Sequence, residues 1–71
     1  MVVNRHGKGP GRVIRALRIH RKLGVRELAE KANVPAGYIS ELETGKKGNP
    51  GLGVLRRLAK ALGVTVGELL E

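Results

Sequence analysis

Aliphatic residues recur along this chain at intervals of three and four, the spacing that places them on one face of an α-helix. The pattern predicts a first helix that starts at Gly11 and is interrupted by Gly24, then helices over residues 25–32, about 36–43 and about 52–62. No stretch alternates apolar and polar residues for long enough to form a strand. The sequence therefore predicts an all-α fold with no sheet.

Residues that start and end helices agree with these boundaries. Asn33 follows the second helix at a tight turn, and asparagine tolerates the left-handed backbone that such a turn needs. Gly45 and Gly63 follow the third and fourth helices. Thr65 and Glu68 form a Thr-x-x-Glu capping box, which opens a fifth, short helix. We therefore expect five short helices.

The composition narrows the possible chemistry. The chain has 71 residues, enough for one small domain, and its one aromatic residue is Tyr38, so the core must be aliphatic. It has no cysteine, which excludes disulfides, thiolate metal sites and a cysteine nucleophile. His6 and His20 lack metal-site spacing, and no nucleophile–base pair, paired carboxylates or phosphate-binding glycine loop occurs. We expect no metal, no cofactor, no small-molecule site and no enzymatic activity.

The charge indicates the kind of partner. Fourteen Lys and Arg residues against six acidic ones give a net charge of +8 and a pI near 11.0. On so short a chain this excess favours a polyanionic partner, most often nucleic acid, over a merely basic soluble protein. No apolar run approaches the roughly 18 residues of a membrane span, and no signal-peptide core is present. We expect no membrane association and a cytoplasmic, nucleoid-associated location.

The first ten residues differ from the rest of the chain. They carry Arg5 and Lys8 among glycines and show no apolar periodicity. Residues 1–10 are predicted to be a flexible basic arm that follows a phosphate backbone or enters a minor groove, or else a disordered terminus. Residues 11–71 are expected to form the folded domain. This length leaves no room for a separate ligand-sensing domain, so we expect regulation through concentration, dimerisation or a partner protein.

The second and third helices form a recognisable pair. Each spans about eight residues, and Asn33-Val34 joins them too tightly for an extended hairpin. Ala29 is small enough to let the two helices cross closely, and Val34 anchors the corner. The arrangement over about 25–44 is that of a helix-turn-helix, whose second helix can enter the major groove of DNA.

From Gly11 to Leu70 the chain resembles the Cro/repressor-type helix-turn-helix family, also called the xenobiotic-response-element family. The matching stretches, in the family's order and spacing, are GRVIRALR, RELAEKANV, YISELETGKKGNP and LRRLAKALGVTVGELL. The resemblance implies a compact five-helix, lambda-repressor-like DNA-binding domain. It also implies a repressor-like transcriptional regulator that binds double-stranded DNA as a homodimer on a palindromic site, with its third helix in the major groove.

In this family the N-terminal half of the third helix faces base edges. The resemblance therefore implies base-facing roles for Ala36, Gly37, Tyr38, Ser40 and Glu41. None of these is Arg, Lys, Asn or Gln, the residues that bond bidentately to guanine or adenine, so we expect modest base specificity. Alternatively, Ser40 and Glu41 are solvated surface and Tyr38 covers the edge of the core.

The family also pairs two charged positions across its first and third helices, here Arg18 and Glu43. Each lies beside a core leucine, where an unpaired charge is costly, so we expect an ion pair that supports the scaffold. Phosphate contacts are expected to supply most of the affinity, from residues on both sides of the third helix: Arg5, Lys8, Arg12, Arg26, Thr44, Lys46, Lys47 and Asn49.

The end of the chain and the choice of partner leave alternatives open. Val66, Leu69 and Leu70 are the expected dimer contacts, or else they close the domain's own core. A second function is an antitoxin or adaptor that uses the fold to hold a protein such as a toxin. The third helix lacks the usual base-reading residues, which favours that role, whereas the positive charge opposes it. General RNA or architectural DNA binding also fits the charge, but it predicts no preferred sequence.

Overall fold

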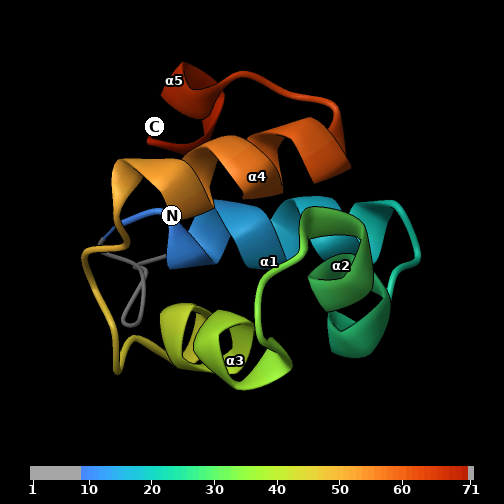
Figure 1. The fold of residues 1–71 in the computed structure, drawn as a ribbon, viewed down its shortest axis with the longest axis horizontal. Coiled ribbons are helices and arrows are strands. Elements are labelled where there is room, and N and C mark those ends of the chain that lie inside the picture. The colour runs from blue at the N-terminus through green and yellow to red at the C-terminus, as the bar shows by residue number, and fades with distance from the viewer. Residues whose placement is uncertain (1–8, 71) are drawn as a thin grey trace, which may run out of the picture.

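The structure is a computed structural model that describes residues 9–70. These residues form five helices and no strand (Figure 1): α1 (Gly11–His20), α2 (Val25–Ala32), α3 (Ala36–Thr44), α4 (Leu52–Leu62) and α5 (Val66–Leu69). The predicted five-helix, all-α fold is confirmed, and α2 and α4 have the bounds expected from their apolar periodicity.

The helices surround one aliphatic core. α1 runs through the middle of the fold, with α4 and α5 stacked on one side of it and α3 on the other (Figure 1). α3 packs against α1 and α2, and α4 packs against α2 and α5. Every helix contributes to the largest fully buried side chains, which are Ile14, Leu28, Ile39, Leu42, Leu58, Leu62 and Leu69. Between residues 9 and 70 no polar or charged residue is fully buried, so the chemistry of this domain lies at its surface.

α1, α2 and α4 end with the same kind of turn. A residue just past each helix adopts a left-handed backbone, with φ of 59° at Lys22, 57° at Asn33 and 73° at Gly63. The next N–H then donates to the carbonyl five positions earlier, at 2.9 to 3.0 Å. This pairing satisfies carbonyls that a helix end leaves free. The predicted left-handed Asn33 is confirmed.

The first helix is shorter than predicted. We expected it to continue until Gly24, but α1 ends at His20 and the chain turns left-handed at Lys22. Leu23 lies in the connection to α2 instead of on the helix, with its side chain partly buried against the core. The end of α1 could not be predicted from the local sequence, because lysine seldom adopts a left-handed backbone.

The capping box at α5 forms as predicted. Thr65 Oγ1 accepts a hydrogen bond from the Glu68 N–H at 3.1 Å, and Glu68 Oε1 accepts one from the Thr65 N–H at 2.8 Å. Leu69 is 0% exposed, so it closes the domain's own core, and its alternative role as a dimer contact is excluded in this fold. Val66 is partly buried against the same core, whereas Leu70 is 58% exposed.

α1 begins in direct contact with the last turns of α3. Gly11, the first residue of α1, is buried. A Cβ atom built on it would overlap the carbonyl oxygen of Leu42 and lie 2.6 Å from the Leu42 carbonyl carbon. The absence of a side chain at Gly11 therefore sets how closely α1 and α3 approach.

The predicted basic arm ends earlier than expected. Pro10 is buried, and its carbonyl accepts a hydrogen bond from the Ile14 N–H at 2.9 Å, so it belongs to the folded domain. Gly9 is exposed. The rest of the predicted arm, residues 1–8, lies outside the described residues, and its role stays a prediction.

Candidate nucleic-acid interface

α2 and α3 form the predicted angled pair. Val34 occupies the corner between them and is buried, and Ala29 is buried where α2 approaches its neighbours. Ile39 and Leu42 turn into the core at 0% and 2% exposure. The core therefore holds one face of α3 and leaves the opposite face to solvent.

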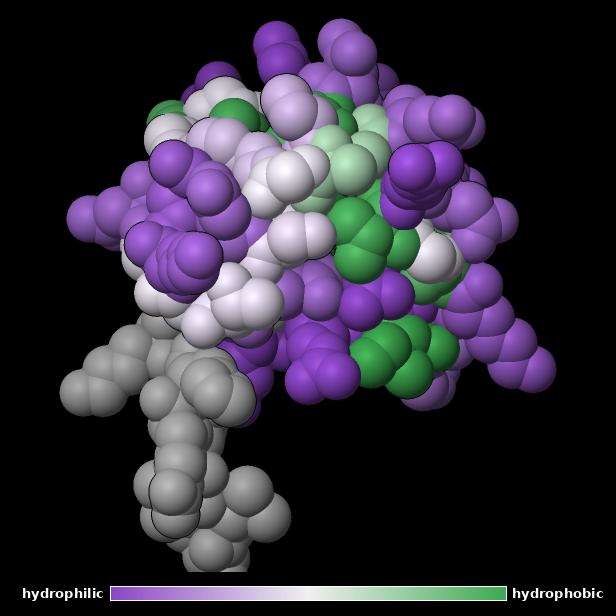
Figure 2. Space-filling model, turned by 90° about the horizontal axis from the view of Figure 1, so that it is seen from below, coloured by the Kyte–Doolittle hydropathy of each residue, from purple (hydrophilic) through white to green (hydrophobic). Residues whose placement is uncertain are grey.

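The outer face of α3 carries small and polar residues. Gly37, Ser40, Glu41 and Thr44 are exposed, whereas Ala36 and Tyr38 are partly buried against the core, as the alternative prediction for Tyr38 expected. Figure 2 looks at the side of the molecule on which α3 lies, where residues of intermediate hydropathy form a pale area with hydrophilic groups on its left and hydrophobic groups on its right. A face without bulky side chains can come close to another surface.

Lys47 follows α3 and folds back over it. Gly45 turns the chain with a φ of 87°, and the Lys47 N–H then donates to the Glu41 carbonyl at 3.0 Å. The Lys47 ammonium lies 3.6 Å from Glu41 Oε1 and 5.1 Å from the centre of the Tyr38 ring. One cation thus contacts two of the residues that were predicted to face bases.

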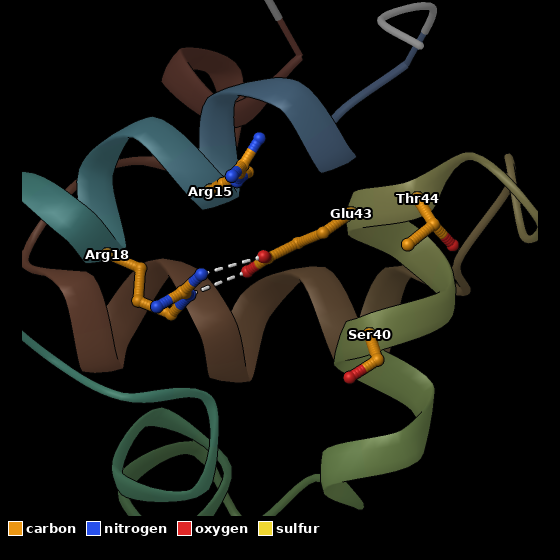
Figure 3. Close-up of a pocket in the computed structure, with 5 residues that line it drawn as sticks. All are labelled: Arg15, Arg18, Ser40, Glu43 and Thr44. Atoms are coloured by element: carbon orange, nitrogen blue, oxygen red, sulfur yellow. Dashed lines mark hydrogen bonds and ion pairs between the residues drawn. The ribbon is translucent and has the colours of Figure 1, made fainter.

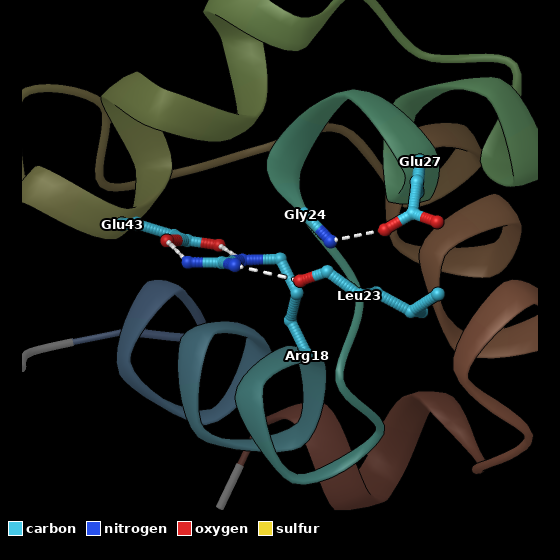
Figure 4. A network of polar contacts seen from close by, with 5 residues as sticks. All are labelled: Arg18, Leu23, Gly24, Glu27 and Glu43. Carbon is cyan, nitrogen blue, oxygen red and sulfur yellow. Dashed lines mark hydrogen bonds and ion pairs between the residues drawn. The ribbon is translucent and has the colours of Figure 1, made fainter.

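The predicted ion pair between Arg18 and Glu43 is confirmed. Arg18 Nε donates to Glu43 Oε2 at 2.8 Å and Nη2 donates to Oε1 at 2.9 Å, a bidentate arrangement (Figure 4). The two side chains are only 13% and 7% exposed. Arg18 Nη1 also donates to the Leu23 carbonyl at 2.8 Å. Hydrogen bonding to Glu43 raises the pKa of Arg18 above its ordinary value. The guanidinium therefore ties α1, α3 and the α1–α2 connection together.

An open pocket lies between α1 and α3 beside this pair. Arg15 and Arg18 line it from α1, and Ser40, Glu43 and Thr44 line it from α3 (Figure 3). Because Arg18 and Glu43 neutralise each other, Arg15 gives the pocket a net positive charge. Arg15 was not among the predicted site residues. Its place three residues before Arg18, on the same helix, was the signal available in the sequence.

The remaining predicted phosphate contacts lie on both sides of α3. Those that the structure describes are exposed: Arg12, Arg26, Thr44, Lys46 and Asn49. The Thr44 hydroxyl donates to the Glu41 carbonyl at 3.4 Å. Glu27, the acidic residue next to Arg26, caps the start of α2. Its Oε1 accepts a hydrogen bond from the Gly24 N–H at 2.7 Å (Figure 4). Arg5 and Lys8 fall outside the described residues.

Two other features, a metal-binding cluster and a membrane-spanning helix, are absent from residues 9–70. No three His, Asp or Glu side chains gather there in a way that could hold a metal ion. No helix in that part of the chain is long and apolar enough to cross a membrane.

Comparison with known proteins decides the family. A helix-turn-helix family model matches residues 14–69, which is more than half of the chain. The chain belongs to the helix-turn-helix family. The resemblance to Cro/repressor-type proteins, inferred from four short stretches, is thereby confirmed.

Similar helix-turn-helix proteins include named regulators. The chain is 44% identical over 60 residues to the transcriptional repressor RghR of Bacillus subtilis, covering 84% of this chain and 44% of RghR. It is 41% identical over 58 residues to the transcriptional regulator DdrOP3 of Deinococcus deserti, covering 82% of this chain and 44% of DdrOP3. The chain therefore spans less than half the length of these two relatives.

The fold of this helix-turn-helix chain also resembles a structure solved with DNA. That structure is SinR of Bacillus subtilis, the master regulator for biofilm formation, in complex with DNA. The likeness has a TM-score of 0.84 at 34% identity and covers 87% of this chain and 98% of that one.

Proposed function

We propose that this chain binds double-stranded DNA as a repressor-like transcriptional regulator, with α3 in the major groove. The observation that carries the proposal is the exposed outer face of α3, on an α2–α3 pair whose fold matches that of SinR bound to DNA. The regulator and repressor names of RghR and DdrOP3 support the same role. The role is binding, and no catalytic step is proposed.

α3 is proposed to enter the groove N-terminus first, with the small residues of its first turn nearest the DNA. Ala36 and Gly37 are small, and no side chain caps the helix at Pro35, so the first backbone amides are available to phosphate oxygens. Glu41 can accept a hydrogen bond from cytosine N4, and Ser40 can bond to several base edges. Since this face lacks Arg, Lys, Asn and Gln, we infer that part of the specificity comes from DNA shape.

Phosphate contacts are proposed on both flanks of α3. Arg15 joins the earlier candidates because it gives the pocket between α1 and α3 a net positive charge beside Ser40 and Thr44. The proposed set within the described residues is Arg12, Arg15, Arg26, Thr44, Lys46 and Asn49.

The chain is further proposed to act as a homodimer on a palindromic site, in the cytoplasm and associated with the nucleoid. Leu70 is the predicted dimer contact that stays well exposed, at 58%. An antitoxin or adaptor role stays a prediction from the sequence. The binding experiment below separates it from the regulator role.

Selection from a random DNA pool at about 150 mM salt, where non-specific binding is weakened, is expected to return a palindromic consensus. Two protomers related by a two-fold axis would present their α3 helices to half-sites about 10 base pairs apart. Sequencing of the bound fraction gives the readout. Retained DNA without a consensus would contradict specific regulation and favour general nucleic-acid binding, and no retention at all would favour the antitoxin or adaptor role.

The affinity is expected to fall steeply with salt. Neutralising about six phosphates gives a slope of roughly −5 in a plot of log K against log salt concentration. In the proposed homodimer the substitution removes one phosphate contact from each protomer, so Lys46→Met should reduce the size of that slope by about 1.8, twice the roughly 0.9 of a single contact. Lys60→Met removes the same charge from an exposed position on α4 and should leave the slope unchanged. Identical slopes for Lys46→Met, Lys60→Met and the parent protein would refute the Lys46 contact.

A further inference from the structure

Two adjacent lysines differ at the end of α3. Lys46 is exposed and makes no ion pair or side-chain hydrogen bond within residues 9–70. Lys47 is partly buried, and its ammonium contacts both the Glu41 carboxylate and the Tyr38 ring. A residue that holds two side chains of the outer face is poorly placed to act only as a phosphate clamp.

Glu41 creates an electrostatic difficulty for a DNA-binding helix. It is exposed on the outer face of α3, where an unpaired carboxylate would be repelled by the phosphates that flank the groove. The Lys47 ammonium, 3.6 Å from Glu41 Oε1, offsets that charge. An exposed ion pair of this kind adds little to folding stability. The ion pair matters instead for DNA binding, because it reduces the repulsion between the Glu41 carboxylate and the phosphates.

The turn after α3 places the Lys47 ammonium over one flank of the helix. Tyr38 and Glu41 are three residues apart on α3, so their side chains lie on neighbouring parts of the helix surface. The Lys47 backbone is anchored by its hydrogen bond to the Glu41 carbonyl, at 3.0 Å, directly after the left-handed turn at Gly45. The side chain therefore returns over the same flank, where its ammonium lies near both residues.

We propose that Lys47 is a positioning residue for base readout. It holds the Glu41 carboxylate and the Tyr38 ring on the DNA-facing side of α3 and keeps the charge of Glu41 from repelling the duplex. Glu41 would then accept a hydrogen bond from an exocyclic amino group of a base, such as cytosine N4 in the major groove. This inference replaces the sequence-based prediction that Lys47 contacts a phosphate, and it rests on the proposed function.

A double-mutant cycle on a fixed duplex tests the inference. Lys47→Met removes the ammonium but keeps most of the aliphatic stem, and Glu41→Gln removes the carboxylate charge but keeps its shape. Lys47→Met is expected to weaken binding about five- to tenfold in the parent protein and less than about twofold in the Glu41→Gln background, as for directly coupled charges. The duplex used is the most enriched sequence of the random pool, with a shuffled duplex of the same composition beside it.

Lys46→Met is the matched control. If Lys46 contacts a phosphate, Lys46→Met should lower the DNA affinity by the same factor in the parent and Glu41→Gln backgrounds. It should leave the base preference unchanged. Lys47→Met should instead alter the preference at one base position in each half-site, the position that Glu41 faces. Both lysines and Glu41 are at the surface, so circular dichroism should give the same helix content for all variants.

The outcomes separate the two proposals. Equal losses for Lys47→Met in both backgrounds, with an unchanged preference profile, would show Lys47 to be a phosphate contact and overturn the inference. A pool that yields no enriched sequence would instead contradict the proposed function. Even then the same cycle on an arbitrary duplex answers whether Lys47 acts by offsetting the charge of Glu41.

Discussion

Gly11→Ala is expected to lower the free energy of unfolding by about 3 kcal/mol, at the upper end of the usual cost of overpacking. The added Cβ would overlap the Leu42 carbonyl oxygen and lie 2.6 Å from the carbonyl carbon. Both are backbone atoms of α3, so no side chain can rotate away, and α1 must move from α3. For a domain of this size the melting temperature should fall by roughly 10–20 °C.

Gly53→Ala is the matched control for this substitution. Gly53 lies within α4, is exposed, and nothing stands within 4 Å of a Cβ built on it. Alanine there should raise the free energy of unfolding by about 0.5–1 kcal/mol, because glycine is the poorer helix former. Chemical denaturation followed by circular dichroism measures both variants. A Gly11→Ala protein as stable as the parent would mean that α1 and α3 do not approach as closely as described.

Glu43→Ala is expected to lower the free energy of unfolding by about 3 kcal/mol, because it leaves the guanidinium of Arg18 largely buried without its carboxylate. Arg18 is only 13% exposed and gives two of its N–H groups to Glu43, at 2.8 and 2.9 Å. Thermal and denaturant unfolding are the measurements. Glu30→Ala, on the exposed face of α2, should change stability by less than about 0.5 kcal/mol.

Two further variants distinguish the geometry of the pair from its charge. Arg18→Lys keeps the charge but lacks the planar fork, so it should recover little of the stability lost with the pair. The double variant Arg18→Met/Glu43→Leu removes both charges together and should be more stable than Glu43→Ala. If Glu43→Ala unfolds with the parent protein, the pair contributes nothing to the scaffold.

Gly11 and the Arg18–Glu43 pair act on the same relationship, the seating of α3 on α1. Gly11 lets α1 touch α3 at the backbone of Leu42. Arg18 then joins α1 to Glu43, the next residue of α3. A shift of α3 would also move its outer face, on which Glu41 and Ser40 lie. We therefore expect both Gly11→Ala and Glu43→Ala to weaken DNA binding as well as stability, although neither residue is proposed to touch DNA.

Local features of the chain were sufficient for most of the secondary structure. The apolar periodicity and the residues that follow each helix defined α2 and α4, since both signals depend only on neighbours in the sequence. The left-handed Asn33 and the Thr65–Glu68 capping box are also local, because the side chain and backbone groups involved lie within a few residues. The family resemblance supplied the Arg18–Glu43 pair, whose members are 25 residues apart.

Features that depend on how the helices pack could not be obtained in this way. Lys22 takes a left-handed backbone although its residue type argues against one, so the end of α1 was misjudged. Leu69 and Leu70 are identical in type, yet one fills the core and the other is exposed, because α5 folds back over α4.

The same limit applies to the candidate site. The helix-turn-helix arrangement and the family resemblance, both taken from the sequence, predicted that α3 faces a partner. The sequence could not distinguish Lys46 from Lys47, place Arg15 beside α3, or show why position 11 must be glycine. Each of these depends on distances between segments that meet only after folding, and residue type alone carries no information about such distances.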